Sequence, residues 1–274
     1  MTPAAATPDG LLTPPELRLC EAGASVGSDW LFRGMDLLLQ PGDWSVIMGP
    51  SGAGKTTLLR LLAGLLAPGE GEARIAGRPW SQIRGVERVA LRRRFGYVQQ
   101  QPGLLHATVK QNVLAPLRWR EMPREQASER ALQSLSEVGM EHLASQSALA
   151  LSGGERQRLA FARALALRPE IWLLDEFTNH QDPRREDVLE SIVGGQIRRG
   201  ATAIIIAHEL GQVERLRASA GSNPSLVVLV DGRWRATDLD HVVDVAKEQD
   251  AVTPYLRRLA ERHAAVHDRP SKQE

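Results

Sequence analysis

The sequence predicts an α/β fold in which a parallel sheet is flanked by helices. Two features predict it. Short apolar runs alternate with longer helical stretches along much of the 274 residues, as in parallel strands joined by helices. In addition, an apolar run leads directly into a glycine-rich turn and then a helical stretch (44–66). Hydrophobic residues make up 42% of the chain, so a sizeable core is expected.

In the first part of the chain, the apolar pattern favours short strands before and after each turn signal. Strands are predicted at 17–22, 35–42, 44–49, 72–77 and 95–100, and helices at 55–66 and 86–94.

Residues 108–147 have a different character. They contain no good strand pattern, and 123–140 form an amphipathic helical stretch. We therefore expect a mostly helical lobe inserted in the main domain, with limits at about 100–165.

From Leu151 onward the alternation returns. Strands are predicted at 170–176, 201–209, 225–230 and 233–237, and helices at 154–167, 184–199, 210–219 and about 240–265. Asp231-Gly232 between the last two strands is a hairpin signal, and 219–225 is expected to be a polar surface loop.

Composition narrows the function classes. The net charge is only +1, which gives no support for a polyanion-binding protein, and the single cysteine, Cys20, excludes an internal disulfide. No run approaches the roughly 18 apolar residues that span a bilayer, and the N-terminus lacks a secretory pattern. We expect a soluble chain with a disordered start (1–14), whose membrane role, if any, comes through a partner.

The glycine-rich turn has the pattern of a phosphate-binding loop. Gly49, four intervening residues, Gly54, Lys55 and Thr56 satisfy G-x-x-x-x-G-K-[ST], with a strand before and a helix after. Backbone amides of 52–57 would face phosphate oxygens at the helix N-terminus. Lys55 would reach the β- and γ-phosphates, and the Thr56 hydroxyl would bind Mg²⁺. The predicted ATP-binding residues are Gly49, Pro50, Ser51, Gly52, Ala53, Gly54, Lys55, Thr56 and Thr57. A tight turn without a ligand is the structural alternative.

A phosphate-binding loop requires a carboxylate at the end of another buried strand to hold the metal. The run 171–174 is followed by Asp175 and Glu176. Asp175 would anchor the Mg²⁺ shell through water, and Glu176 could polarise an attacking water. A helix cap or salt bridge is the alternative for either carboxylate, but the adjacent pair favours a hydrolase.

A second phosphate-type site is suggested at 151–165, where a serine and two glycines open a long helix. An ordinary helix start explains Ser152 as the cap and Glu155 as its capping-box partner. It does not explain why glycines stand where better helix formers would serve.

These three segments, in this order and spacing, resemble the ATPase subunit of an ATP-binding-cassette (ABC) transporter over about residues 16–235. The signature segment (151–158, LSGGERQR) is the most specific of them. The resemblance implies a P-loop NTPase core with an N-terminal antiparallel β subdomain and an inserted α-helical subdomain, within a domain at 15–240 that is followed by a C-terminal helix and tail (241–274). It implies that two subunits meet head to tail around two ATP-Mg²⁺, with the signature residues acting in trans. Those residues are Ser152, Gly153, Gly154 and Glu155.

Two further segments fit the same family. The Q-loop (95–105) places the metal- and water-contacting glutamine at Gln100, so the metal residues are Thr56, Gln100 and Asp175. The switch segment places the γ-phosphate contact at His208, which joins Glu176 as a catalytic residue. By resemblance, the Q-loop also touches the membrane subunit.

The D-loop (177–182, FTNHQD) departs from the family. Phe177, His180 and Gln181 replace the common residues, so communication between the two sites is expected to differ. The family also stacks adenine on an aromatic residue at a position that aligns with Val26, where Trp30 is the candidate substitute. Stacking contributes about 1–3 kcal/mol, so weaker selectivity is expected rather than loss of binding.

The resemblance implies an ATPase that powers a separate membrane permease, a bacterial importer of a small solute or oxyanion. Its expected partners are a second ATPase subunit, transmembrane permease subunits and a solute-binding protein, with no direct nucleic acid contact. Its expected place is cytoplasmic, peripheral at the inner face of the membrane. The alternatives are a soluble ABC ATPase acting on ribosomes, nucleic acid or cofactor assembly, and a non-hydrolytic regulator. Intact Lys55, Asp175, Glu176 and His208 argue against the regulator.

Overall fold

The computed structural model describes residues 13–238 and 252–267. A six-stranded sheet forms its centre, in the order β10-β9-β3-β8-β7-β6. All its pairings are parallel except that of the edge strand β10 with β9. The strands are β3 (Trp44–Met48), β6 (Phe95–Val98), β7 (Ile171–Asp175), β8 (Thr202–Ile206), β9 (Ser225–Val230) and β10 (Arg233–Asp238). The predicted parallel sheet and the hairpin at 231–232 are confirmed.

A second, four-stranded sheet is antiparallel and has the order β2-β1-β4-β5. Its strands are β1 (Leu17–Val26), β2 (Asp29–Leu39), β4 (Glu70–Ile75) and β5 (Arg78–Pro79). The first two are longer than the predicted strands at 17–22 and 35–42, and they meet in a short turn. Register shifts in β1 interrupt its inward–outward alternation, and this irregularity hides the second half of the strand from a period-two reading.

Helix α1 (Lys55–Leu62) lies between the two sheets. Its leucines share one apolar cluster with Leu17 and Ile75 of the antiparallel sheet and with Ile47 and Ile204 of the central sheet. The helix is therefore apolar on nearly all sides, as its sequence predicts. It stops four residues before the predicted end, and the indole of Trp80 donates a hydrogen bond to the Leu62 carbonyl there (3.1 Å).

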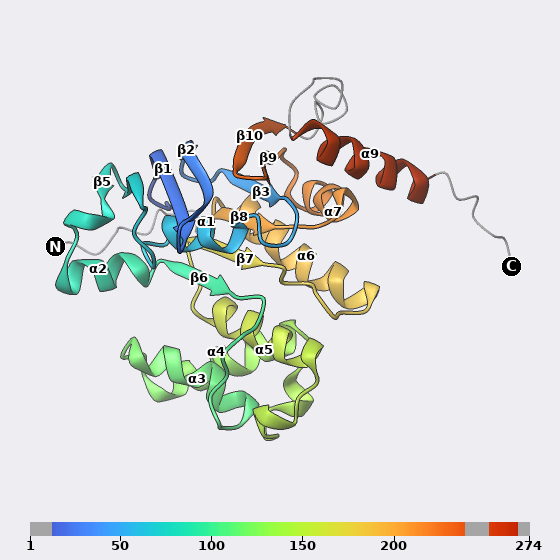
Figure 1. Cartoon of the computed structure of the whole chain (residues 1–274). Coiled ribbons are helices and arrows are strands. Elements are labelled where there is room, and N and C mark those ends of the chain that lie inside the picture. The colour runs from blue at the N-terminus through green and yellow to red at the C-terminus, as the bar shows by residue number, and fades with distance from the viewer. Residues whose placement is uncertain (1–12, 239–251, 268–274) are drawn as a thin grey trace, which may run out of the picture.

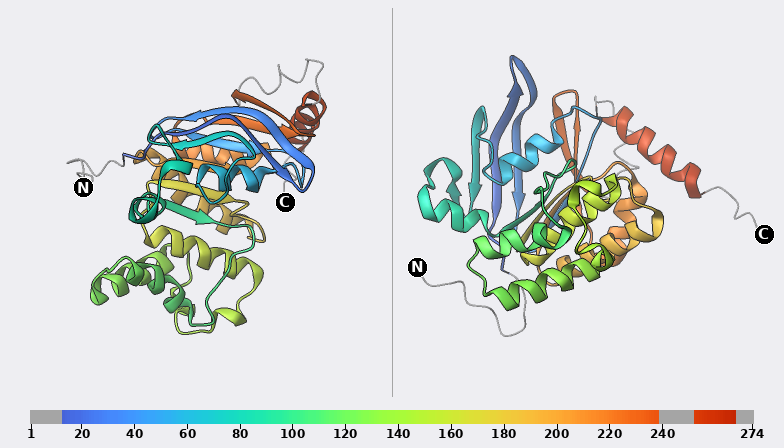
Figure 2. Two further views of the ribbon diagram at one scale, coloured as in Figure 1. Left: turned by 60° about the vertical axis from the view of Figure 1, so that its left-hand side comes forward. Right: turned by 90° about the horizontal axis from the view of Figure 1, so that it is seen from below.

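The opposite face of the central sheet packs against helices. Val46, Trp172 and Ile205 point to that face and join a second cluster. The helices of this layer are α5 (Gly153–Ala166), α6 (Pro183–Arg198) and α7 (Leu210–Ala220). Successive residues of each strand thus serve opposite layers, and Figure 2 shows the helical lobe set apart from the two sheets.

The helical lobe contains α3 (Val109–Trp119) and α4 (Arg124–Glu137), which pack on α5. Beside the antiparallel sheet lies α2 (Gly85–Arg92), and α9 (Thr253–His267) packs against α7. Short 3-10 turns occur at Trp80–Gln82, Glu141–Leu143 and Ala148–Ala150. The predicted helix at 240–265 is present from Thr253, and its earlier part lies outside the described residues, as do 1–12 and 268–274.

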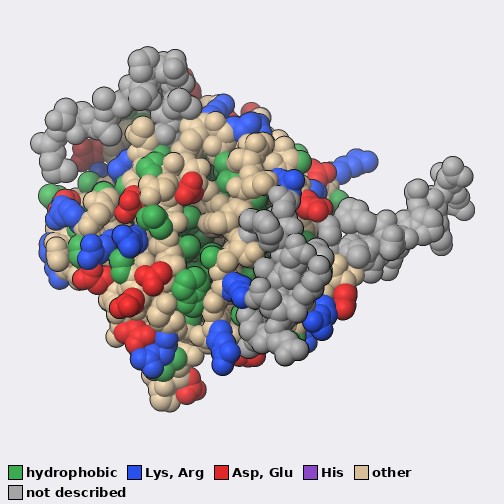
Figure 3. All heavy atoms as spheres, turned by 90° about the horizontal axis from the view of Figure 1, so that it is seen from above, with side chains coloured by type: hydrophobic (Ala, Val, Ile, Leu, Met, Phe, Trp, Pro, Cys, Tyr) green, Lys and Arg blue, Asp and Glu red, His purple; other side chains and the backbone are tan. Residues whose placement is uncertain are grey.

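The surface seen from above carries interspersed basic and acidic side chains with apolar groups between them (Figure 3). This mixture agrees with a formal net charge of +1. Among residues 13–238 and 252–267, no helix is both long enough and apolar enough to cross a membrane.

Candidate functional site

Apart from the signature residues, the predicted site residues lie at or just after the carboxyl ends of four parallel strands. The phosphate-binding loop (49–57) follows β3, His208 comes two residues after β8, Glu176 follows β7, and Gln100 comes two residues after β6. These strands are consecutive neighbours in the sheet. Because parallel strands end at one edge, the fold gathers segments that lie far apart in the sequence, at the edge where α/β sheets bind ligands.

The loop conformation depends on glycine at its first position. Gly49 has φ 154° and is so close to β9 that an added Cβ would lie 2.2 Å from the Leu229 carbonyl oxygen. Gly54, which precedes α1, has φ 96°. These positions are closed to a side chain, which explains the spacing of the two glycines in the motif.

Lys55 is buried at the start of α1. Its ammonium donates hydrogen bonds to the carbonyl oxygens of Gly49 (2.8 Å) and Pro50 (2.9 Å), and so holds the loop closed around its own side chain. Burial lowers the pKa of Lys55, while the charges of Glu176 and Asp175 act in the opposite direction. The side chain is thus a cation placed inside the loop and available to an anion there.

The Thr56 hydroxyl donates a hydrogen bond to Oδ2 of Asp175 (2.7 Å). Burial raises the pKa of the Asp175 carboxyl, and the bond from Thr56 partly counteracts this. A hydroxyl and a carboxylate in contact supply the oxygen ligands that Mg²⁺ prefers. The described residues contain no cluster of three His, Cys, Asp or Glu able to hold a metal.

Glu176 has three polar neighbours. Its Oε2 accepts hydrogen bonds from the side-chain amides of Gln100 (2.7 Å) and Asn179 (2.5 Å). Its Oε1 contacts Nε2 of His208. The Glu176 side chain is only 10% exposed, so these groups fix the direction of a nearly buried carboxylate beside the phosphate-binding loop. Two amides and an imidazole held on one carboxylate are a suitable setting for activating a water.

Gln100 has two glutamine neighbours in the sequence, and the structure separates their roles. Gln100 reaches Glu176. The backbone carbonyl of Gln99 instead accepts a hydrogen bond from Gln157 of α5 (3.1 Å). Of the three consecutive glutamines, the geometry therefore supports Gln100 as the site residue.

Ser152 caps α5 in a complete capping box. Its backbone N–H and its hydroxyl both donate to the Glu155 carboxylate, at 2.8 and 2.7 Å, and these bonds lower the pKa of Glu155. The ordinary helix start is thus present. In the described part of the chain, no hydrogen bond joins Ser152–Glu155 to the phosphate-binding loop, so the signature segment is not brought together with the rest of the site within one subunit.

The two signature glycines have different surroundings. A Cβ on Gly153 would meet nothing within 4 Å, whereas one on Gly154 would lie 2.5 Å from the His180 carbonyl oxygen. Gly154 is therefore required by a close approach of the D-loop in the same subunit. Gly153 is exposed and leaves its surface open to an incoming group.

Val26 and Trp30 both lie near the turn of the β1–β2 hairpin. The Trp30 ring is 40% exposed, and the Arg33 guanidinium lies 4.5 Å from its centroid. The next residue, Leu31, approaches Gly54, where an added Cβ would be 3.0 Å from it. This placement keeps Trp30 the better candidate for adenine stacking.

The C-terminal helix borders the site. The sequence did not predict this position of the helix. A cavity of about 310 Å³ is lined by Gly49, Pro50, Ser51 and His208 on one side and by Tyr255, Arg258 and Leu259 of α9 on the other. Helix α9 is held by buried Leu256 and Leu259. Asn179 was missed as well, although its spacing three residues after Glu176 was a usable signal.

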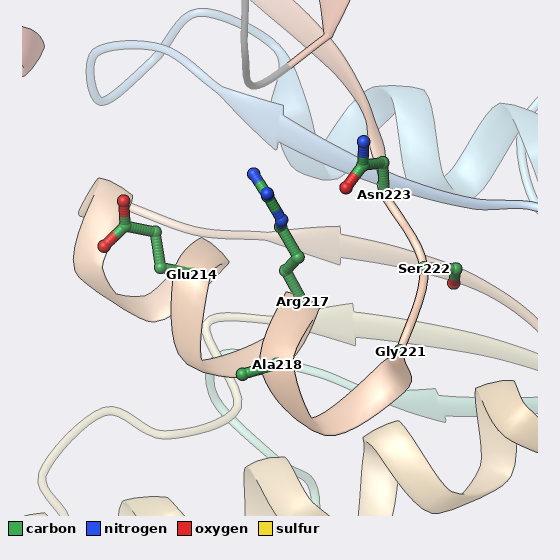
Figure 4. Close-up of a pocket in the computed structure, with 6 residues that line it drawn as sticks. All are labelled: Glu214, Arg217, Ala218, Gly221, Ser222 and Asn223. Atoms are coloured by element: carbon green, nitrogen blue, oxygen red, sulfur yellow. The ribbon is translucent and has the colours of Figure 1, made fainter.

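A second cavity, of about 430 Å³, lies at the far end of α7 (Figure 4) and is lined by Glu214, Arg217, Ala218, Gly221, Ser222 and Asn223. Ser222 accepts a hydrogen bond from the indole of Trp44, the first residue of β3 (3.0 Å). The cavity is therefore near the amino end of β3, away from the phosphate-binding loop that follows its other end.

Known proteins have sequences similar to that of this chain. The family model described as ABC transporter matches residues 32–179. The chain is 40% identical over 230 residues to phosphate import ATP-binding protein PstB 2 of Natronomonas pharaonis, covering 80% of this chain and 78% of that protein. It is 35% identical over 193 residues to tungstate uptake system ATP-binding protein TupC of Peptoclostridium acidaminophilum, covering 70% and 86%.

The fold agrees with these sequence matches. The ATP-binding cassette MJ0796, solved as a dimer in a post-hydrolysis state with ADP and Pi, superposes with a TM-score of 0.73 at 28% identity. The match covers 81% of this chain and 98% of that one. With four of the motif segments gathered at one sheet edge and the family matched over more than half of the sequence, the chain belongs to the ABC transporter family and is one of its ATP-binding, ATP-hydrolysing subunits.

Proposed function

We propose that this chain hydrolyses ATP to drive import of a small oxyanion through a separate membrane permease. The observation that carries the catalytic part is the set of contacts at Glu176, whose carboxylate is held by Gln100, Asn179 and His208 beside the phosphate-binding loop. The similarity to phosphate and tungstate uptake ATPases supports the oxyanion and the direction of transport.

The roles of the site residues follow from their chemistry. Backbone amides of the loop and the Lys55 ammonium bind the β- and γ-phosphates. Thr56 and Asp175, with Gln100, would hold Mg²⁺, which neutralises phosphate charge when it is bound. Glu176 orients and polarises the attacking water, and His208 contacts the γ-phosphate while holding the carboxylate through its Nε2.

We infer that the active species is a head-to-tail pair of cassettes. Ser152 and Gly153 are exposed at the start of α5 and, within one subunit, make no hydrogen bond to the phosphate-binding loop in the described residues. A second subunit would bring this helix N-terminus to the first subunit's ATP, where its amides favour an anion. The dimeric state of the similar cassette supports this arrangement.

The remaining partners are proposed from the same family membership. Permease subunits would be moved by closure of the dimer, and a solute-binding protein would deliver the oxyanion to them. The chain would then work in the cytoplasm, at the inner face of the membrane. No specific observation favours the alternative of a soluble ABC ATPase acting on ribosomes or nucleic acid.

Uptake by cells tests the proposal. The chromosomal gene is replaced by the Glu176→Gln form, and uptake of radiolabelled phosphate, tungstate, molybdate and an amino acid is compared with that of the parent strain. We expect the Glu176→Gln strain to lose uptake of one oxyanion and to take up the amino acid as the parent strain does. Loss of amino acid uptake alone would contradict the proposal that the transported solute is an oxyanion. Unchanged uptake of all four, with ribosomes rather than a membrane protein co-purifying with the chain, would contradict transport.

A further inference from the structure

The D-loop (177–182) joins the catalytic carboxylate to the signature helix α5 within one subunit. It begins directly after Glu176 and ends at Asp182, the N-cap of α6. Two of its three departures from the family pattern, Phe177 and Gln181, contact α5 through their side chains. The third, His180, approaches α5 through its backbone carbonyl.

The first contact is aromatic. Phe177 is fully buried, and its ring stacks on Phe161 of α5 with centroids 5.8 Å apart and planes at 23°. Phe161 in turn packs on Trp172 of β7 at 5.5 Å. Such aromatic pairs contribute beyond their buried area, so the start of the D-loop is anchored to the middle of the signature helix.

The second contact is a pair of hydrogen bonds made by Gln181. Its Nε2 donates to the Gly154 carbonyl oxygen (2.9 Å), and its Oε1 accepts from Nη1 of Arg158 (2.8 Å). Arg158 is only 4% exposed, so this bond is protected from water and strong for its kind. The His180 carbonyl lies close to Gly154 as well. The first turn of α5 is thus clamped to the D-loop.

The other end of this connection is Asn179, which donates to Oε2 of Glu176. The same oxygen accepts from Gln100, whose neighbour Gln99 is held by Gln157 of α5. Gln157 and Arg158 are adjacent in the helix, and each holds one of the two loops that reach the catalytic carboxylate. A tilt of α5 would therefore move both amides that orient Glu176.

We propose that Gln181 is a positioning residue that, through Asn179, sets the Glu176 carboxylate according to the orientation of the subunit's own signature helix. The inference rests on the proposed function, because it assigns Glu176 the role of activating water. Since α5 would bind the partner's ATP with its N-terminus, the link makes the geometry at one ATP depend on engagement of the other.

A double-mutant cycle on ATP turnover tests the link. Gln181→Leu removes both hydrogen bonds of the clamp, and Asn179→Ala removes the contact with Glu176. We expect Gln181→Leu to lower kcat about tenfold, as displacement of a reacting group does, with KM for ATP within twofold of wild type. We expect the double variant to be no slower than the slower single variant, because either change breaks the same connection.

Controls separate positioning from folding. Gln133→Leu, on the exposed side of α4, should turn over ATP like wild type. Thermal unfolding, together with binding of a fluorescent ATP analogue, shows whether each variant is folded. If Gln181→Leu does not fold, Arg158→Met breaks the clamp from the helix side and is expected to show the same kcat loss. A kcat unchanged in the folded clamp variant, or losses in kcat that multiply in the double variant, would overturn the inference.

Wild type and Glu176→Gln are measured in the same series. If Glu176→Gln retains turnover, the proposed function fails. If Glu176→Gln is inactive while Gln181→Leu equals wild type, only the clamp is refuted.

Discussion

The hydroxyl of Thr56, in the first turn of α1, donates a hydrogen bond to the carboxylate of Asp175 at the end of β7, across 2.7 Å. This bond joins the phosphate-binding loop to the end of β7, the strand that carries the predicted carboxylate pair. We expect Asp175→Asn to keep an oxygen acceptor for Thr56 but to lose the charge that we propose holds Mg²⁺. ATPase activity at saturating Mg-ATP should fall by about 10²-fold or more, as for loss of one electrostatic group in an active site. Activity near wild type in a steady-state assay would contradict the metal assignment.

The same substitution should also change how the stability of the folded protein depends on pH. Burial raises the folded-state pKa of Asp175, so the native state binds more protons than the unfolded state between the ordinary pKa of Asp, about 3.9, and the raised value. Stability contributed by the protonated group is then lost as pH rises through that window. Without nucleotide or Mg²⁺, Asp175→Asn should be at least as stable as wild type at neutral pH. In urea titrations, the difference in free energy of unfolding between Asp175→Asn and wild type should shrink toward acid pH. A difference that grows on acidification would contradict a raised pKa for Asp175.

Lys55→Ala is expected to weaken ATP binding. The buried ammonium of Lys55 donates hydrogen bonds to two loop carbonyls. When ATP binds, a contact with phosphate would replace these bonds. A hydrogen bond to a charged group contributes about 1.5–3 kcal/mol, so affinity should fall roughly 10- to 100-fold in a titration with a fluorescent ATP analogue. Lys110→Ala, in α3 of the helical lobe, is the matched control and should bind like wild type. Equal affinity for Lys55→Ala and Lys110→Ala would remove the loop from the binding site.

The two signature glycines should respond oppositely to alanine. Gly154→Ala places a Cβ against the D-loop backbone, so the free energy of unfolding should fall by about 1–3 kcal/mol. Gly153→Ala meets open space and should match or exceed wild type, by up to about 1 kcal/mol, through helix propensity. Gly153→Ala should nonetheless lower ATPase activity, because we propose that the partner's ATP binds at the Gly153 surface. Urea unfolding and ATPase assays on both variants check this, and a destabilised Gly153→Ala would refute the assignment of open space.

Local patterns predicted much of the fold. The phosphate-binding loop, the strand ending at Asp175 and the hairpin at Asp231 each depend on residues within a few positions of one another, and the structure has them where the sequence indicates. The second half of β1 was missed because its bulges break the alternation on which strand prediction depends.

The contacts that organise the site are not local. Gln181 meets Arg158, 23 residues away, and Gln100 meets Glu176, 76 residues away. No local period encodes such pairs. Tyr255 lines a cavity with residues of the phosphate-binding loop because of how α9 packs. No sequence motif predicts that packing. The difference between Gly153 and Gly154 likewise required the position of the D-loop.

The central claim is that two copies of this chain enclose ATP between the phosphate-binding loop of one and the signature helix of the other. Light scattering of Glu176→Gln with Mg-ATP tests it most directly, with the nucleotide-free protein and the Lys55→Ala/Glu176→Gln double variant as references. We predict a dimer for Glu176→Gln only when Mg-ATP is present, and monomers for both references. A Glu176→Gln protein that binds Mg-ATP at saturation yet stays monomeric would contradict the account.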